Sequence, residues 1–149
     1  MIIRVQEEDF DSAALQRELV AGRSDIGAIA TFIGLVRDLA DDPLKEMCLE
    51  HYPGMTEKAL TMIAEQASER WQVLDLAVVH RIGALKPADQ IVLVMVASAH
   101  RGDAFAACEF IMDYLKTEAP FWKKETSEAG EKWVEARKSD LSAQKKWEK

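Results

Sequence analysis

The sequence has few cysteines and prolines and no long apolar segment. Its 149 residues include two cysteines, four prolines and seven glycines. Cys48 and Cys108 stand far apart, with no CxxC pair and no histidine spacing typical of a zinc site. These absences argue against a disulfide-rich secreted protein and against a zinc protein. They predict a reduced, cytoplasmic protein.

A positive charge balance and a membrane-length apolar run are also missing. No run approaches the roughly 20 apolar residues that a membrane helix needs. Lys and Arg number 19 against 26 Asp and Glu, for a formal charge of −7. Broad nucleic-acid binding depends on a basic surface that neutralises phosphates. We therefore expect neither a membrane partner nor a nucleic-acid partner, and any anion site must be a local group of cationic side chains.

Familiar catalytic motifs are absent as well. The sequence has no Walker loop and no GxGxxG, HExxH, GxSxG or EF-hand pattern. A nucleotide or acyl-phosphate hydrolase is the weakest hypothesis, because such an enzyme needs a phosphate loop or a metal cluster.

Strand and helix patterns alternate along the chain without a linker, which predicts one domain of the α/β or α+β class. Helices are predicted after a cap at Asp11 or Ser12, over 55–71 and over 102–119. Strands are predicted over 2–5, 27–36, 44–52, 73–82, 91–97, 121–126 and 132–136. We assign 1–137 to the domain and expect 138–149 to be a polar tail that is frayed, mobile or loosely docked.

A buried strand followed by a long helix lies at the centre of this organisation. The apolar run at 91–97 is typical of a strand covered on both faces. A basic turn with His100 and Arg101 follows, and Asp103 is predicted to cap the next helix. Pro120 should end that helix, because the residue before a proline disfavours helical conformation.

The predicted helix carries two neighbouring stripes. The core stripe is Ala104, Ala107, Ile111 and Leu115, and beside it run Phe105, Cys108, Met112 and Lys116. Lys123 follows Lys116 beyond the proline, so a chain that turns back can bring the two amines together. Mutual repulsion and burial lower the pKa of a lysine, which then serves as a base or nucleophile. The same pattern fits two surface lysines with buried stems.

Further cationic groups stand at predicted strand ends and turns, namely Arg37, His100, Arg101 and Arg137. Arginine offers a planar fork for phosphate or carboxylate, although each one also fits a surface ion pair. His51 and His80 are isolated within strand patterns, so we interpret them as structural. Cys108 has apolar neighbours on the helix, which favours packing over a nucleophilic role.

Several segments together resemble one known family, in order and at coherent spacing over most of the chain. They are TFIGLVR at 31–37, EHYPGM at 50–55, VHRIG at 79–83, SAHR at 98–101, FIMDYLKT at 110–117, APFWKKE at 119–125 and WVEAR at 133–137. The family is the large, catalytic subunit of molybdopterin synthase, the MoaE family.

The resemblance implies an α/β-hammerhead fold with an additional antiparallel β subdomain. It also implies a homodimer that binds two small ubiquitin-like sulfur carriers as a heterotetramer. The carrier's C-terminal Gly-Gly thiocarboxylate enters a pocket and passes sulfur to cyclic pyranopterin monophosphate (precursor Z), which forms the dithiolene of molybdopterin. Sulfur arrives on the carrier and molybdenum enters a later product, so the resemblance implies no metal and no cofactor.

The family's site residues correspond to named positions here. The essential lysine matches Lys116 and the second active-site lysine matches Lys123. The predicted substrate-binding residues are Arg37, His100, Arg101, Met112, Glu125 and Arg137. The family pocket lies near the dimer interface, so both protomers can contribute to it.

One departure from the family is the acidic loop at 38–43, which stands beside Arg37 and bears on access to the pocket. The alternative hypothesis is a non-catalytic scaffold that binds a ubiquitin-like sulfur carrier. The retention of every cationic position of the pocket counts against that alternative.

Overall fold

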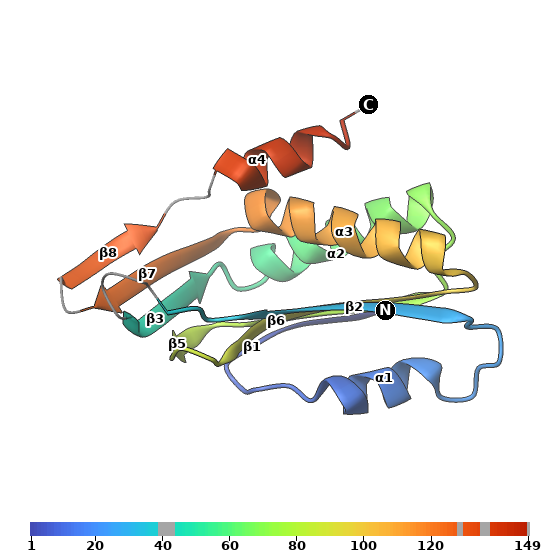
Figure 1. Cartoon of the computed structure of the whole chain (residues 1–149), viewed down its shortest axis with the longest axis horizontal. Helices are drawn as coiled ribbons and strands as arrows, with labels where there is room; N and C mark the ends of the chain where they lie inside the picture. Colours follow the sequence, from blue (N-terminus) through green and yellow to red (C-terminus); the bar gives the residue numbers. More distant parts are fainter. Residues whose placement is uncertain (39–43, 128–129, 135–137, 149) are drawn as a thin grey trace.

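The computed structural model describes residues 1–38, 44–127, 130–134 and 138–148. Within these ranges the chain forms eight strands and four helices, arranged as two sheets, of which the first has helices packed on its faces (Figure 1). In chain order they are β1 (Ile2–Gln6), α1 (Ser12–Val20), β2 (Ala28–Leu35), β3 (Leu44–His51), α2 (Met55–Arg70), β4 (Asp75–Arg81), β5 (Gly83–Leu85), β6 (Gln90–Ser98), α3 (Arg101–Glu118), β7 (Phe121–Ser127), β8 (Gly130–Val134) and α4 (Lys138–Lys145).

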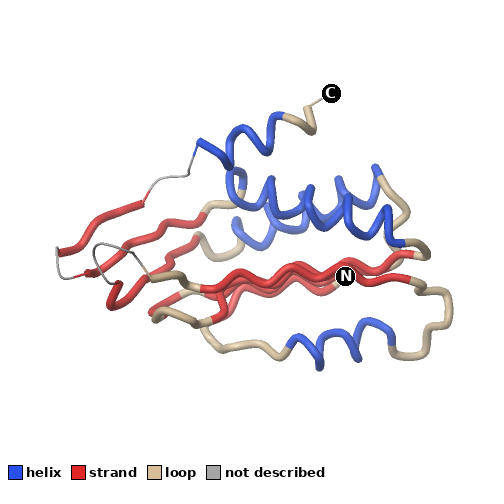
Figure 2. Tube along the Cα trace, in the orientation of Figure 1, coloured by secondary structure: helices blue, strands red, loops and turns tan. Residues whose placement is uncertain are grey.

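The first sheet has the strand order β1-β4-β6-β2 and lies between two layers of helix (Figure 2). Helices α2 and α3 cover one face, and α1 covers the other. Alternate residues of β6 enter the two cores: Val92 and Val94 pack toward α2 and α3, whereas Leu93 and Met95 pack toward α1. The prediction of a strand buried on both faces is therefore confirmed.

The second sheet is antiparallel, with the order β5-β3-β7-β8, and lies at one end of the molecule. Met47, Leu49 and Leu85 form a small core on one of its faces together with Val36 from the segment after β2. The two sheets and their helices confirm the predicted α+β fold with an additional antiparallel β subdomain. None of the helices in the described ranges is long and apolar enough to span a membrane.

Two glycines of the second predicted strand mark the close approach and the bulge that such residues indicate. A Cβ added to Gly27 would lie 2.2 Å from the carbonyl oxygen of Ala99, so only glycine fits there. At Gly34 the register of the ladder between β2 and β6 shifts, and an added Cβ would lie 2.9 Å from a methyl carbon of Val92.

The predicted cap of α3 is wrong. Asp103 lies inside the first turn of α3, and its carboxylate accepts a hydrogen bond from the backbone N–H of Gln72 at 2.9 Å. The residue that precedes the helix, His100, makes no side-chain capping bond. For α1, where either Asp11 or Ser12 was predicted as the cap, Asp11 is the cap, with Oδ1 3.0 Å from the N–H of Ala13.

Residues beyond 137 contain a helix, α4, that was not predicted from the sequence. After α4, the indole of Trp147 packs edge-on against Trp71 and Phe110, and its Nε1 donates to Asp113 at 2.6 Å. Lys146 forms an ion pair with Glu109 of α3. The division of the chain at residue 137 and the mobility of the tail stay predictions. No strand was predicted over Gly83–Leu85, where the structure has β5.

Two side chains of α2 test the assignment of the core between α2, α3 and the first sheet. Leu60 is 1% exposed and Met62 is 51% exposed. Leu60→Ala leaves a cavity and should lower the free energy of unfolding by about 2–5 kcal/mol. Met62→Ala should change it by less than about 1 kcal/mol. Urea denaturation of both variants measures the difference, and equal losses would contradict the packing described for α2.

Candidate functional site

The two predicted catalytic lysines lie on either side of the corner between α3 and β7. Lys116 is an exposed residue in the last turn of α3, one turn beyond the buried Met112. The helix ends at Glu118, as Pro120 predicts. From that end the chain continues into β7, a strand of the second sheet (Figure 1). Lys123, the third residue of β7, is half-buried.

A buried threonine holds this corner. The hydroxyl of Thr56, at the start of α2, donates to the carbonyl oxygen of Pro120 at 3.1 Å. The same oxygen atom of Thr56 accepts from the backbone N–H of Tyr52 at 3.1 Å. Thr56 is completely buried, so both bonds are shielded from water. The turn before α2 and the turn after α3 are thereby joined through one side chain.

One face of β7 carries Phe121, Lys123 and Glu125, because side chains alternate along a strand. Lys123 is directly opposite Leu49 of β3, and Glu125 is opposite Met47. Leu49 and Met47 pack against Val36, and the exposed Arg37 follows Val36 directly. The fold therefore places Arg37, Lys123 and Glu125 at the same end of the molecule.

His80 lies beneath the corner. It is 5% exposed, and its ring stacks on that of Phe121 with the centroids 3.9 Å apart and 20° between the planes. Its Nδ1 lies 2.8 Å from the carbonyl oxygen of Arg81. The pKa of His80 is lowered to about 4, mainly by burial and to a smaller extent by electrostatic repulsion from Lys116 and His51, while the bond to Arg81 opposes the shift. His80 is therefore neutral near pH 7.

His100 and Arg101 lie at the opposite end of α3. They follow β6, and α3 then runs back along the sheet, so that Lys116 reaches the end where β6 begins. The 15 residues from Arg101 to Lys116 span about 22 Å at the helical rise of about 1.5 Å per residue. Within one chain, this pair is therefore separated from the two lysines. Arg137 and most of the acidic loop, residues 39–43, lie outside the described residues.

The structure thus brings five predicted site residues to one end of the molecule and places two at the other end. The five are Arg37, Met112, Lys116, Lys123 and Glu125. The bond of Thr56 to Pro120 and the stack of His80 on Phe121, which lie at the corner between the two lysines, were not predicted from the sequence. The segment VHRIG at 79–83 offered a signal for His80, since a lone histidine ended an apolar strand. The burial of His80 agrees with its interpretation as structural.

Cys108 faces the core, as the sequence predicts. It is 7% exposed, and its Sγ lies 3.7 Å from the carbonyl oxygen of Val94. Burial raises the pKa of the thiol to about 11, so almost no reactive thiolate exists at neutral pH. A packing role for Cys108 is confirmed.

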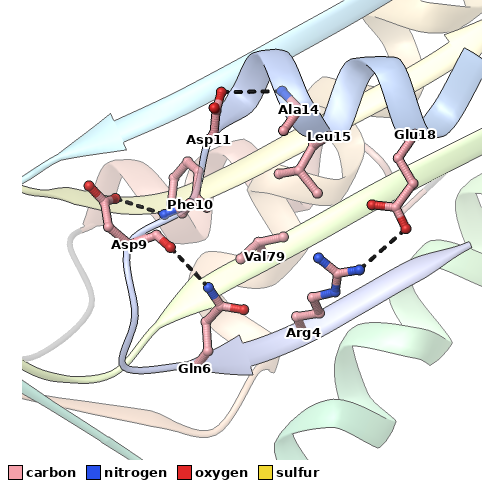
Figure 3. A pocket seen from close by; sticks show the side chains of 9 residues that line it. All are labelled: Arg4, Gln6, Asp9, Phe10, Asp11, Ala14, Leu15, Glu18 and Val79. Atoms are coloured by element: carbon pink, nitrogen blue, oxygen red, sulfur yellow. Dashed lines mark hydrogen bonds and ion pairs between the residues drawn. The ribbon is translucent and has the colours of Figure 1, made fainter.

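Two clefts lie near the surface of the described residues. One, of about 440 Å³, is lined by Glu50, His51, Tyr52 and Trp122, and it opens beside the corner because His51 is directly opposite Phe121. The other, of about 190 Å³, lies between α1 and β1, where Arg4 and Glu18 form an ion pair at 3.4 Å (Figure 3). It is on the far face of the first sheet, and no predicted site residue lines it.

Comparison with known proteins gives a consistent result. Residues 5–118 match the MoaE protein family. The chain is 62% identical to the molybdopterin synthase catalytic subunit of Ralstonia nicotianae, over 97% of this chain and 83% of that protein. It is 54% identical to the molybdopterin synthase catalytic subunit of Pseudomonas aeruginosa, over 99% of each.

Solved structures agree with the sequence relatives. The molybdopterin biosynthesis MoaE protein from Burkholderia ambifaria superposes with a TM-score of 0.85 at 57% identity, over 98% of this chain and 97% of that one. Molybdopterin synthase from Staphylococcus aureus superposes with a TM-score of 0.83 at 32% identity, over 89% and 96%.

The depressed pKa of His80 predicts a specific dependence of stability on pH. The unfolded chain binds a proton near pH 6.5, whereas the folded chain resists protonation down to about pH 4. The stability that comes from keeping His80 neutral is complete above pH 6.5 and is lost as the pH falls toward 4. Between pH 7 and pH 5 this loss of unfolding free energy amounts to about 2 kcal/mol. Asparagine does not titrate, so wild type should lose about that much more stability than His80→Asn in urea denaturation. Equal losses of stability in the two proteins would refute the depressed pKa of His80.

Proposed function

The chain belongs to the MoaE family, and on that basis we propose that it is the catalytic subunit of a molybdopterin synthase, a sulfurtransferase of molybdenum cofactor biosynthesis. It transfers sulfur from the C-terminal thiocarboxylate of a small ubiquitin-like carrier to cyclic pyranopterin monophosphate, and two transfers form the dithiolene of molybdopterin. This proposal is supported by the near-full-length similarity to catalytic subunits. The corner between α3 and β7, which holds Lys116 and Lys123 at one end of the molecule, agrees with it.

The charges at this corner suit the reactants. Both the thiocarboxylate of the carrier and the phosphate of the substrate are anions, and Arg37, Lys116 and Lys123 offer them cations on an otherwise acidic protein. The arginine suits phosphate because its guanidinium presents a planar fork. We assign Met112 and Glu125 to the same substrate pocket.

The chemistry needs a proton carrier and a group that stabilises negative charge. The thiocarboxylate sulfur forms a bond to a carbon of the substrate while a carbon–oxygen bond at that carbon breaks and the departing oxygen takes up a proton. The bond between sulfur and the acyl carbon of the carrier must then break. Water or a lysine amine has to accept that acyl group. Lys116 assists this transfer as an acid–base or covalent group, and Lys123 stabilises the developing charge. Cys108 takes no part, since its thiol is buried in the core.

The distance along α3 supports a pocket shared between two chains. His100 and Arg101 lie about 22 Å from Lys116 along the helix, too far to meet one substrate in the same protomer. A homodimer can bring this pair from one protomer to the lysine corner of its partner. With one carrier on each protomer the assembly is a heterotetramer. Arg137 is assigned to the same pocket.

We place the protein in the cytoplasm. Both of its cysteines, Cys48 and Cys108, are free thiols, which suits a reducing compartment.

Replacing Lys116 tests the proposed catalytic role. In a mixture of thiocarboxylated carrier and precursor Z, Lys116→Ala should lower the rate of molybdopterin formation at least about a hundredfold, because the reaction loses its acid–base group. Lys145→Ala, an exposed lysine of α4, serves as the matched control and should keep the wild-type rate. Mass spectrometry of the half-sulfurated intermediate follows each transfer. Full activity of Lys116→Ala would refute its role, and carrier binding without transfer by wild type would support the scaffold alternative.

Mixed dimers test the shared pocket. Lys116→Ala and the double variant His100→Ala/Arg101→Ala should each be inactive alone. After subunit exchange, half of the dimers are mixed and each has one intact pocket of two, so about a quarter of wild-type activity should return. If all of these residues served one chain, every pocket in the mixture would lack a residue and no activity would appear.

A further inference from the structure

The buried His80 lies where the two lysine-bearing elements meet. Its ring stacks on Phe121, the first residue of β7, at 3.9 Å between centroids. Lys123 is two residues further along and on the same face of that strand. Lys116, at the end of α3, is near enough for its charge to act on the imidazole. One side chain is thus adjacent to both sides of the corner.

The hydrogen bond of His80 determines which form of the ring is present. A carbonyl oxygen only accepts hydrogen bonds, so the proton of the neutral imidazole is on Nδ1, which donates to Arg81 at 2.8 Å. This bond fixes the plane of the ring against β4. One face of the ring is covered by Phe121, which lies directly opposite His51 of β3.

The charges around His80 favour the neutral form. Lys116 from α3 and His51 from β3 both disfavour a proton on it. His51 itself lies 3.5 Å from Glu57 of α2. A neutral, flat ring can therefore stack on Phe121 without adding a third positive group at the corner.

We propose that His80 is a positioning residue for sulfur transfer, which fixes the start of β7 through Phe121 and so sets Lys123 relative to Lys116. This inference rests on the proposed function. The bond from Thr56 to Pro120 holds the preceding residue of the same corner, so positions 120 and 121 are each fixed by a side chain from another element. Neither Thr56 nor His80 needs to contact the substrate for this role.

Four variants separate positioning from simple core packing. His80→Asn removes the ring and keeps an N–H donor, whereas His80→Phe keeps a ring to stack and removes the donor. Phe121→Leu removes the other ring. Leu76→Ala is the matched control: Leu76 is 1% exposed on the same face of β4, four residues from His80 and about 13 Å away along the strand.

The assay is sulfur transfer in the reconstituted complex of carrier and full chain, with kcat and KM for the pterin substrate and Kd for the carrier. His80→Asn and Phe121→Leu should each lower kcat about ten- to a hundredfold, since a misplaced catalytic group loses rate steeply. KM and Kd should stay within about twofold. His80→Phe should recover most of kcat, and Leu76→Ala should keep it despite a lower melting temperature. The double variant His80→Asn/Phe121→Leu should be no slower than the slower single variant, because both remove the same stack.

Wild-type kcat in His80→Asn would overturn the inference, as would an equal loss in Leu76→Ala or independent, multiplying losses in the double variant. If His80→Asn does not fold, Phe121→Leu and His80→Phe decide the matter by the same criteria. A wild-type chain that binds carrier but transfers no sulfur would overturn the proposed function, and this inference with it. An active wild type with an unaffected His80→Asn would overturn the inference alone.

Discussion

The abrupt change of direction at Pro120 is the constraint on which the arrangement of the site depends. A helix that continued past Glu118 would carry Lys123 further from Lys116 with each turn. The chain instead leaves as a strand, and two contacts from distant elements fix its departure: the hydroxyl of Thr56 on Pro120 and the ring of His80 on Phe121. The end of the helix is set locally by Pro120, whereas the angle between α3 and β7 is set by tertiary contacts.

The straightness of α3 has the opposite effect. It keeps His100 and Arg101 away from the lysines of the same chain, since a helix is a rigid spacer of fixed rise. In the proposed dimer this separation has a function, because each α3 can contribute residues to two pockets, one at each of its ends. A site divided in this way is complete only in the assembled enzyme, which couples activity to association.

The elements that sequence predicted well are those whose signal is local. The apolar run at 91–97, Asp11 before α1 and Pro120 after α3 each act within a few residues, and their elements appear where expected. Asp103 was mistaken for a cap because its actual partner, the N–H of Gln72, is 31 residues away. For α4, the packing of Trp147 on Trp71 and Phe110 depends on residues far apart in sequence.

The site shows the same division. The residue types that match the family were identified from sequence, but their grouping at two ends of α3 follows from the path of the helix. The contacts of Thr56 with Pro120 and of His80 with Phe121 join three separate segments, and no periodicity within any one of them reveals that they meet. Such contacts are set by the packing of α2 and α3 on the first sheet.

The tight contact at Gly27 has a consequence for evolution of the dimer. A Cβ at this position would lie 2.2 Å from the carbonyl oxygen of Ala99, so any larger residue would push away the loop that bears His100 and Arg101. In the proposed assembly that loop reaches into the neighbouring subunit. Selection on this glycine of one polypeptide would therefore act through the turnover of the other, although Gly27 itself has no side chain to offer a substrate.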